Sequence, residues 1–288
     1  MTSRSVVVPF IVSLVAAPIV FAIALALSGP AEAEHVTLAL FAATLVVEAL
    51  AIGRAVIARR MFSPSDTGYA TWTLIVLFLV VRMLVETRLA TINFQLVPKY
   101  GEGSSSALFF YVVVLRYLYT VSDVLFITAL ANTIRAYKST GLKFEMISRD
   151  YLYIALVWAI PALTFIFRDN LIYSNTAGTD NYIATFRLVT ATVGAFIASL
   201  CIVVRRYVSQ MGGGAVARVW TMVVIAGIAR DGSFLALALL SKWWRPGAGF
   251  IEQYLLWIFA CCWLIAALYQ QEVLPRASKS ELVTATAR

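Results

Sequence analysis

Histidine and cysteine, the usual ligands of transition metals in proteins, are scarce in this sequence. The chain has one histidine, His35, and three cysteines that all lie inside apolar runs: Cys201, Cys261 and Cys262. Zinc and haem sites need several such ligands at characteristic spacings, and those spacings do not occur here. We therefore expect no metal site, no cofactor and no disulfide framework.

The motifs of several common enzyme chemistries are also missing. The sequence contains no Walker loop, no Gly-x-Ser-x-Gly elbow, no His-Glu-x-x-His pair and no Asp-Asp-x-x-Asp box. The last apolar run has no lysine that could bind retinal as a Schiff base. What remains is proton chemistry by carboxyl groups in an apolar interior, or the movement of a solute through it.

Charged residues make up only 13% of the chain, whereas hydrophobic residues make up 61% and the mean hydropathy is +0.85. A soluble domain is about half apolar, so this composition indicates a membrane protein. Apolar runs of about 20 residues, enough to cross a hydrocarbon core as a helix, recur along nearly the whole sequence.

These runs predict an all-α fold, a polytopic bundle of about eight transmembrane helices. The expected single transmembrane domain covers residues 1–275, followed by a tail at 276–288. The predicted spans are 6–28, 36–58, 70–92, 108–134, 151–168, 183–204, 218–241 and 250–271.

Lysine and arginine are distributed unevenly between the spans. Alternate connections are rich in them, which is typical of cytoplasmic segments. The basic connections carry Arg59, Arg60, Arg135, Lys138, Lys143, Arg149, Arg205, Arg206, Arg218, Arg276 and Lys279. The other connections are acidic or mixed, with Glu32, Glu34, Lys99, Glu102, Asp169, Asp180, Lys242 and Arg245. This pattern predicts that both termini are cytoplasmic.

The first apolar run has a second interpretation. Arg4, the run itself and the small residues at 31–33 loosely resemble a secretory signal with its cleavage site. Cleavage would leave seven helices, as in a receptor-like sensor. The run is longer than the usual signal core, which favours a retained first helix.

Charged side chains inside the predicted spans are the strongest indication of function. A charge at the centre of a span costs about 2.5–3.5 kcal/mol on translocon scales, so these residues should pair or line a hydrated cavity. The spacing between Arg82 and Glu86 is one helical turn, and Arg116, Tyr119 and Asp123 share one helix face. The full set is Glu48, Arg82, Glu86, Arg116, Asp123, Arg187, Arg230 and Asp231.

The alternating topology places these charges in a central polar site that opens toward the non-cytoplasmic side. Simple adhesion between helices stays an alternative for any single pair. Aromatic side chains near the charges could line an apolar pocket, with ordinary packing as the alternative for each ring. The expected binding residues are Tyr111, Tyr119, Trp158, Tyr254 and Trp257, together with Arg82 and Arg187.

With acids at Glu86, Asp123 and Asp231 among aromatic residues, the chain resembles the small integral-membrane terpene cyclases of fungal meroterpenoid pathways. The resemblance is to the epoxide-opening, ascofuranone-type group and covers size, number of spans and the acids. It is not supported by a signature motif. In the seven-helix branch one Glu and one Asp form the acid pair, which Glu86 and Asp231 match loosely, whereas the eighth span departs from that branch.

The resemblance implies a metal-independent cyclase, of isomerase or lyase type, that protonates an epoxidised or olefinic prenyl chain. Burial favours the neutral form of a carboxyl group, which such an acid needs. Asp123 and Asp231 would be the acids, with Glu86 supporting, and Arg116 and Arg230 would set their ionisation. The implied partners are a lipophilic prenylated substrate and membrane lipid, without nucleic acid. The implied location is the endoplasmic reticulum or another internal membrane.

A transporter or lipid-handling protein is the alternative, because the same charges could form a proton or anion relay. Many transporters carry inverted repeats, and no repeat is evident here, which tips the expectation toward the enzyme.

Overall fold

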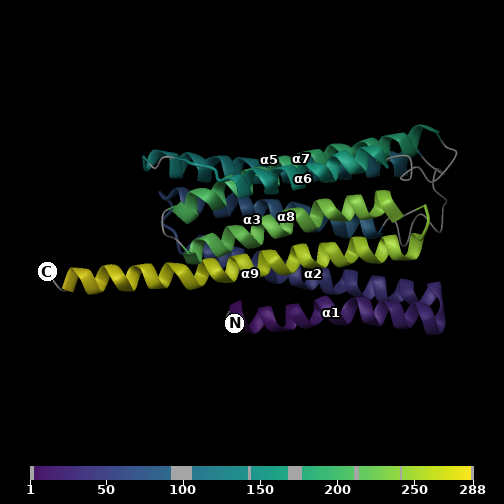
Figure 1. Ribbon diagram of the computed structural model, residues 1–288, viewed down its shortest axis with the longest axis horizontal. Helices are drawn as coiled ribbons and strands as arrows, with labels where there is room; N and C mark the ends of the chain where they lie inside the picture. The colour runs from purple at the N-terminus through teal and green to yellow at the C-terminus, as the bar shows by residue number, and fades with distance from the viewer. Residues whose placement is uncertain are drawn as a thin grey trace.

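The computed structural model describes residues 3–91, 106–141, 144–167, 177–210, 214–240 and 242–286. Within these ranges the regular structure is helical throughout, which confirms the predicted all-α fold (Figure 1). The helices are α1 (Ser3–Ser28), α2 (Pro30–Arg60), α3 (Thr67–Thr91), α5 (Ser106–Ser139), α6 (Ser148–Ile166), α7 (Ala177–Gln210), α8 (Gly214–Leu240) and α9 (Arg245–Thr286).

Each of these eight helices contains a stretch long and apolar enough to cross a membrane, as expected of a multi-pass membrane protein. The stretches agree with the predicted spans to within a few residues. They are Ser5–Ser28, Glu32–Arg60, Thr67–Arg88, Val113–Ser139, Ser148–Ile166, Thr185–Gln210, Val216–Leu240 and Pro246–Val273.

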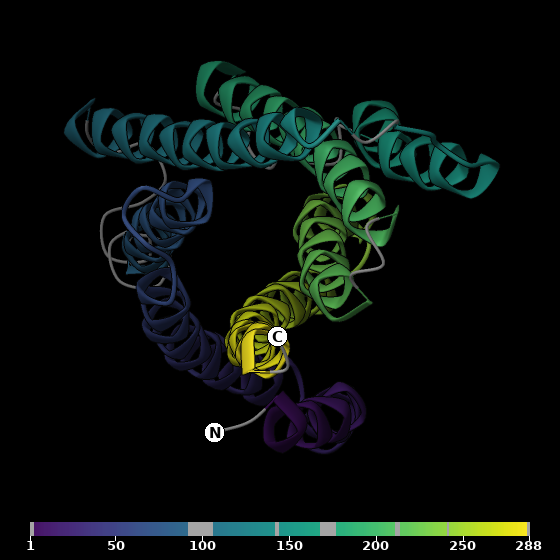
Figure 2. The ribbon, with the colours of Figure 1, turned by 90° about the vertical axis from the view of Figure 1, so that its left-hand side faces the viewer.

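Six helices form a closed ring, seen end-on in Figure 2. Each helix packs against the next in the order α2, α3, α5, α7, α8 and α9, and α9 packs against α2. The other two helices lie outside this ring: α1 packs on α2 and α9, and α6 packs on α7 and α8. A side chain therefore reaches the interior of the bundle only from one of the six ring helices.

Successive helices run in opposite directions, so α1 begins and α9 ends toward the same end of the bundle (Figure 1). Gly29 makes the reversal between α1 and α2 possible because its φ of 87° is one that side chains rarely tolerate. The end that carries both termini also carries the basic ends of the helices, and we call it the basic end. It includes Arg59, Arg60, Arg135, Lys138, Arg205 and Arg206.

The outer helix α1 is attached to α9 by specific contacts. The Ser3 hydroxyl donates to Glu272 at 2.9 Å, and the Trp257 indole donates to Ser13 at 3.0 Å. The small residues at 31–33 lie in the first turns of α2, where Ala33 is fully buried. These contacts hold α1 and the start of α2 against α9.

A block of aromatic side chains fills the ring interior on the side of the basic end. Phe78 of α3 stacks on Phe126 of α5 with 4.7 Å between ring centroids, and Trp263 of α9 lies 5.3 Å from Phe126 and 5.7 Å from Phe78. Such pairs contribute about 0.5–1.5 kcal/mol each beyond the area they bury. Packing of this kind matters in a membrane, where lipid is as apolar as the core.

Candidate functional site

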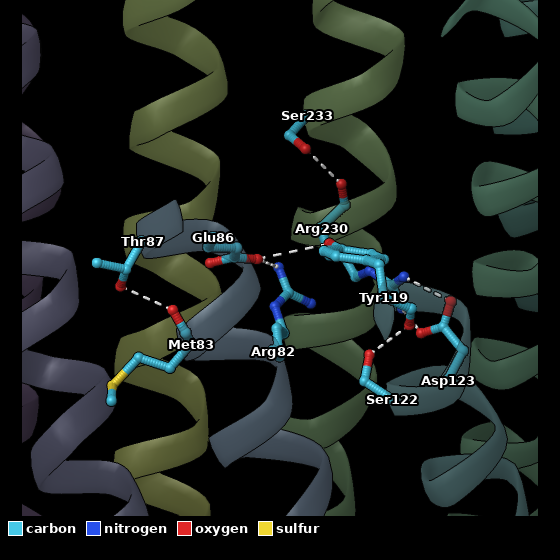
Figure 3. Close-up of polar contacts among 9 residues, drawn as sticks. All are labelled: Arg82, Met83, Glu86, Thr87, Tyr119, Ser122, Asp123, Arg230 and Ser233. Atoms are coloured by element: carbon cyan, nitrogen blue, oxygen red, sulfur yellow. Dashed lines mark hydrogen bonds and ion pairs between the residues drawn. The ribbon is translucent and has the colours of Figure 1, made fainter. Parts of the chain in front are cut away.

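Two buried ion pairs lie at the centre of the ring (Figure 3). On α3, Arg82 contacts Glu86 at 2.6 Å, one helical turn away. Between α8 and α5, Arg230 binds Asp123 with both terminal nitrogens, at 2.7 and 2.9 Å. A two-pronged arginine–carboxylate contact is among the strongest side-chain interactions, so Asp123 is held as a charged partner.

Tyr119 of α5 lies between the two pairs (Figure 3). Its ring is 5.0 Å from the Arg230 guanidinium and 5.5 Å from that of Arg82, and its hydroxyl donates to Glu86 at 3.5 Å. On α9, the Phe259 ring lies 3.6 Å from the Arg82 guanidinium. Aromatic faces stabilise a desolvated cation by about 2 kcal/mol, which offsets part of the cost of burying both arginines.

The arginine side chains cross the interior of the ring. Neither α5 and α8 nor α3 and α9 are packed neighbours among the described residues. Arg230 nevertheless reaches Asp123, and Arg82 reaches Phe259. The two guanidinium groups therefore occupy the ring interior at this level.

A serine lies next to the charged residues on both α5 and α8, and its hydroxyl group bonds to its own helix. The Ser122 hydroxyl donates to the carbonyl of Tyr119, and that of Ser233 to the carbonyl of Arg230, each at 2.6 Å. A serine that bonds back to its own helix satisfies its buried hydroxyl without needing a partner on another helix. These small serine side chains therefore leave space in the interior for the larger side chains of Tyr119 and Arg230.

Two further acids belong to the same cluster, and neither makes an ion pair with a guanidinium group that the structure describes. Asp231 of α8 is 0% exposed, and Glu48 of α2 is also buried. Asp231 interacts electrostatically with Arg230, Asp123 and Arg82. Glu48 interacts with Glu86 and Arg82. The inner cluster therefore comprises Glu48, Arg82, Glu86, Tyr119, Asp123, Arg230 and Asp231.

The inner cluster contains twice as many carboxyl groups as guanidinium groups. Glu86 and Asp123 match the charges of Arg82 and Arg230, which leaves Glu48 and Asp231 in excess. An uncompensated ion in a protein interior costs several kcal/mol. In the ring interior as a whole, which also holds Arg116, Arg187 and Glu252, five acids face four arginines. Charge balance therefore favours a proton on at least one acid, and Glu48 and Asp231 are the acids without a guanidinium partner.

A second set of charges, the outer cluster, lies farther from the basic end. The outer cluster consists of Arg116, Arg187 and Glu252. Each lies seven residues before a residue at the level of the inner cluster: Arg116 before Asp123, Arg187 before Gly194, and Glu252 before Phe259. Seven residues of helix rise about 10 Å. Glu252 interacts electrostatically with Arg187, Glu86 and Arg116, and Arg116 also lies 4.8 Å from the Phe186 ring.

The interior of the ring is therefore layered along its axis. The aromatic block comes first from the basic end, since Phe78 lies one turn before Arg82 on α3. The inner cluster follows, and then the outer cluster. The outer cluster therefore lies on the side of the inner cluster that is away from the basic end.

All eight charged residues expected inside the spans lie in these two clusters. The aromatic residues divide differently. Tyr119 lies in the inner cluster, but Trp158 on the outer helix α6 is 41% exposed and donates to Ser199 at 3.2 Å. Tyr254 donates to the Leu14 carbonyl at 2.7 Å and, like Trp257, contacts α1. The side chain of Tyr111 lies outside the described residues.

Two residues of the site were not expected from the sequence. Glu252 lies near the start of the last span, where an acid is ordinary, and only its contacts on other helices identify it. Phe259 is one of many aromatic residues in α9. Its place seven residues after Glu252, on the same helix face, is the signal that could have found it.

No three His, Cys, Asp or Glu side chains converge to hold a metal ion in the part of the chain that the structure describes. Comparison with family models, curated proteins and solved structures finds no match to this chain.

Proposed function

We propose that this protein is a proton-coupled membrane transporter in which Asp231 and Glu48 carry the protons. One observation carries the proposal: the inner cluster holds two buried carboxyls that no guanidinium matches. Ionisable groups inside a bundle commonly mark proton relays and solute pathways. A purely adhesive cluster needs equal numbers of acids and bases, because each unmatched charge destabilises the bundle.

The geometry offers a way to couple protonation to movement. While Asp231 is neutral, Arg230 binds Asp123 and its side chain crosses the ring. When Asp231 loses its proton, two carboxylates compete for one guanidinium, and a charge pair at about 4 Å is worth roughly 4 kcal/mol near an effective dielectric of 20. That energy is comparable to the attraction of Arg230 for Asp123, so an ionised Asp231 weakens the hold of Asp123 on the guanidinium group and lets it shift.

The side chains on the two sides of the inner cluster differ. The aromatic block separates the inner cluster from the basic end, whereas the outer cluster leads away from it toward the other end. We propose that the described conformation admits protons and solute from the non-cytoplasmic side. Rearrangement of the two ion pairs and of the aromatic block would then open the other side.

A flux assay tests this proposal. The protein is reconstituted in liposomes that contain a pH-sensitive dye, and a panel of amino acids, carboxylates, sugars and organic cations is added outside, one at a time. At least one class of solute should drive proton movement into liposomes that contain the parent protein. The same solute should drive no proton movement with Asp231→Asn. Solute uptake that is unchanged in both Asp231→Asn and Glu48→Gln would contradict proton coupling by these acids.

Acid-initiated cyclisation of a prenyl chain is the second candidate, in line with the resemblance to membrane terpene cyclases. It is favoured by an unmatched acid, Asp231, in the same interior as the aromatic faces of Tyr119 and Phe259. Such faces stabilise carbocations as they do other cations. An enzyme of this kind would work in the endoplasmic reticulum or another internal membrane, where its lipophilic substrate dissolves.

A turnover assay separates the two candidates. Purified protein is incubated with a prenylated phenol that carries a terminal epoxide, in the presence of EDTA. Cyclised product that disappears in Asp231→Asn would favour the cyclase. Absence of product, with proton-coupled flux in liposomes, would favour the transporter.

A further inference from the structure

The carboxyl group of Asp231 fits against α7 at a position where the facing residue has no side chain. An added Cβ on Gly194 would coincide with the Asp231 carboxyl group, whose two oxygens both lie within overlap distance. Neither oxygen has a hydrogen-bond partner among the described residues. Gly194 therefore creates the notch in α7 that holds the acid.

The rest of the α7–α8 contact is tightly packed and apolar. A Cβ on Gly227 of α8 would make ordinary contact, at 3.5 Å, with the Cβ of Ala198 on α7. Outside α7 and α8, α6 adds Val157 and Ile154 to this contact. Two helices packed closely through such small residues leave little space between them to accommodate a new charge.

Few groups near Asp231 can offset a charge on it. On α9, the apolar side chain of Leu255 lies 3.6 Å from where a Cβ on the adjacent Gly232 would be. Arg230 is on the same helix as Asp231, and the groups on α6 that pack here are apolar. The other titratable or charged groups that act on Asp231 are Asp123 on α5, Arg82 on α3 and Cys201 on α7.

We propose that Gly194 is a positioning residue for Asp231 and that the notch makes the packing of α7 against α8 depend on the protonation of that acid. A neutral carboxyl fits the notch without a partner at modest cost. An ionised carboxylate there faces the α7 backbone without compensation, so it pushes the two helices apart as it turns toward Arg230. The inference rests on the proposed function, because it explains how proton loss would reach a second helix.

Steric complementarity tests the notch itself. Gly194→Ala should lower the thermal stability of the purified protein, because the new methyl group overlaps the Asp231 carboxyl. Asp231→Ala should restore room, so Gly194→Ala should be nearly neutral in that background, and the double-mutant cycle should show coupling. Gly227→Ala is the matched control on the same helix pair, and its stability should be close to that of the parent. Equal effects of Gly194→Ala in both backgrounds would overturn the notch.

Cross-linking tests the dependence on protonation. Ala198→Cys with Gly227→Cys, in a protein whose native cysteines are replaced by alanine, places two Cβ atoms at a separation suited to a disulfide. The cross-linking rate is measured across pH in the protein with Asp231 and in the protein with Asp231→Asn. Dividing the first rate by the second cancels the pH dependence of the thiols. This ratio should fall severalfold as pH rises.

A ratio that stays constant with pH would overturn the link between protonation and helix packing. Neither test requires transport. The inference can therefore fail while proton-coupled flux in liposomes remains, and the flux can fail while the steric and cross-linking results stand.

Discussion

Asp123 and Asp231 lie in one cluster, yet the structure predicts opposite consequences when each is changed to asparagine. Asp123 binds both terminal nitrogens of Arg230, and both residues are almost fully buried. Asp123→Asn removes the charge and leaves the guanidinium unmatched, at a cost of about 3–5 kcal/mol. Asp231→Asn instead replaces an acid that has no ionic contact with a neutral group of the same size.

The difference in stability can be converted into a shift of the melting temperature. One kcal/mol lowers the melting temperature of a chain of 150–250 residues by about 2–4 °C, so Asp123→Asn should melt on the order of 10 °C below the parent. Asp231→Asn should melt within a few degrees of the parent while proton-coupled flux is lost. The assay is the temperature at which the detergent-solubilised protein loses its monodisperse size-exclusion peak.

A double-mutant cycle adds the control. The double variant Arg230→Gln with Asp123→Asn lacks both charges. Its loss of stability should be smaller than the sum of the losses of the two single variants, because the double variant leaves no unmatched ion. The reasoning would be refuted if Asp123→Asn were as stable as the parent, or if Asp231→Asn lost as much stability as Asp123→Asn.

Three further outcomes follow from the fold. Reporter fusions after Arg60 and Arg206 should report cytoplasm and fusions at Glu34 and Asp180 the opposite side, because Lys and Arg concentrate at one end of the bundle; a cytoplasmic signal at Glu34 would reverse the orientation. Phe259→Leu should lower the free energy of unfolding by up to about 2 kcal/mol, because the aromatic ring of Phe259 lies on the Arg82 guanidinium. A melting temperature equal to that of the parent would contradict this contact. Trp158→Leu on the outer helix α6 should leave flux within about twofold of the parent, because this partly exposed side chain contacts α7 from outside the ring and does not enter its interior. Loss of flux in a stable protein would place α6 in the transport path.

The helices could be predicted from the sequence because hydropathy acts locally. Lipid requires about 20 apolar residues wherever the chain crosses, so the spans can be read without knowing which helices are neighbours. The same holds for the contact between Arg82 and Glu86, which lie one turn apart on one helix.

Contacts across the ring could not be predicted in this way. The pairing of Arg230 with Asp123 depends on the ring order, and α5 and α8 are not neighbours in it. The same ring order explains why Tyr254 and Trp257, which lie in the same helix as Phe259, contact α1 instead of the charges. Hydropathy does not distinguish an aromatic side chain that faces another helix from one that faces the interior of the bundle.

The protonation of Asp231 can be measured directly by infrared spectroscopy of the purified protein near neutral pH. A protonated carboxylic acid has a carbonyl stretch that is separate from that of a carboxylate and shifts in heavy water. The parent protein should show this band, and Asp231→Asn should lose one component of it. Asp123→Asn should weaken the same component, because Arg230 is then left to pair with Asp231. A spectrum that is the same with and without Asp231 would contradict its role as the proton carrier.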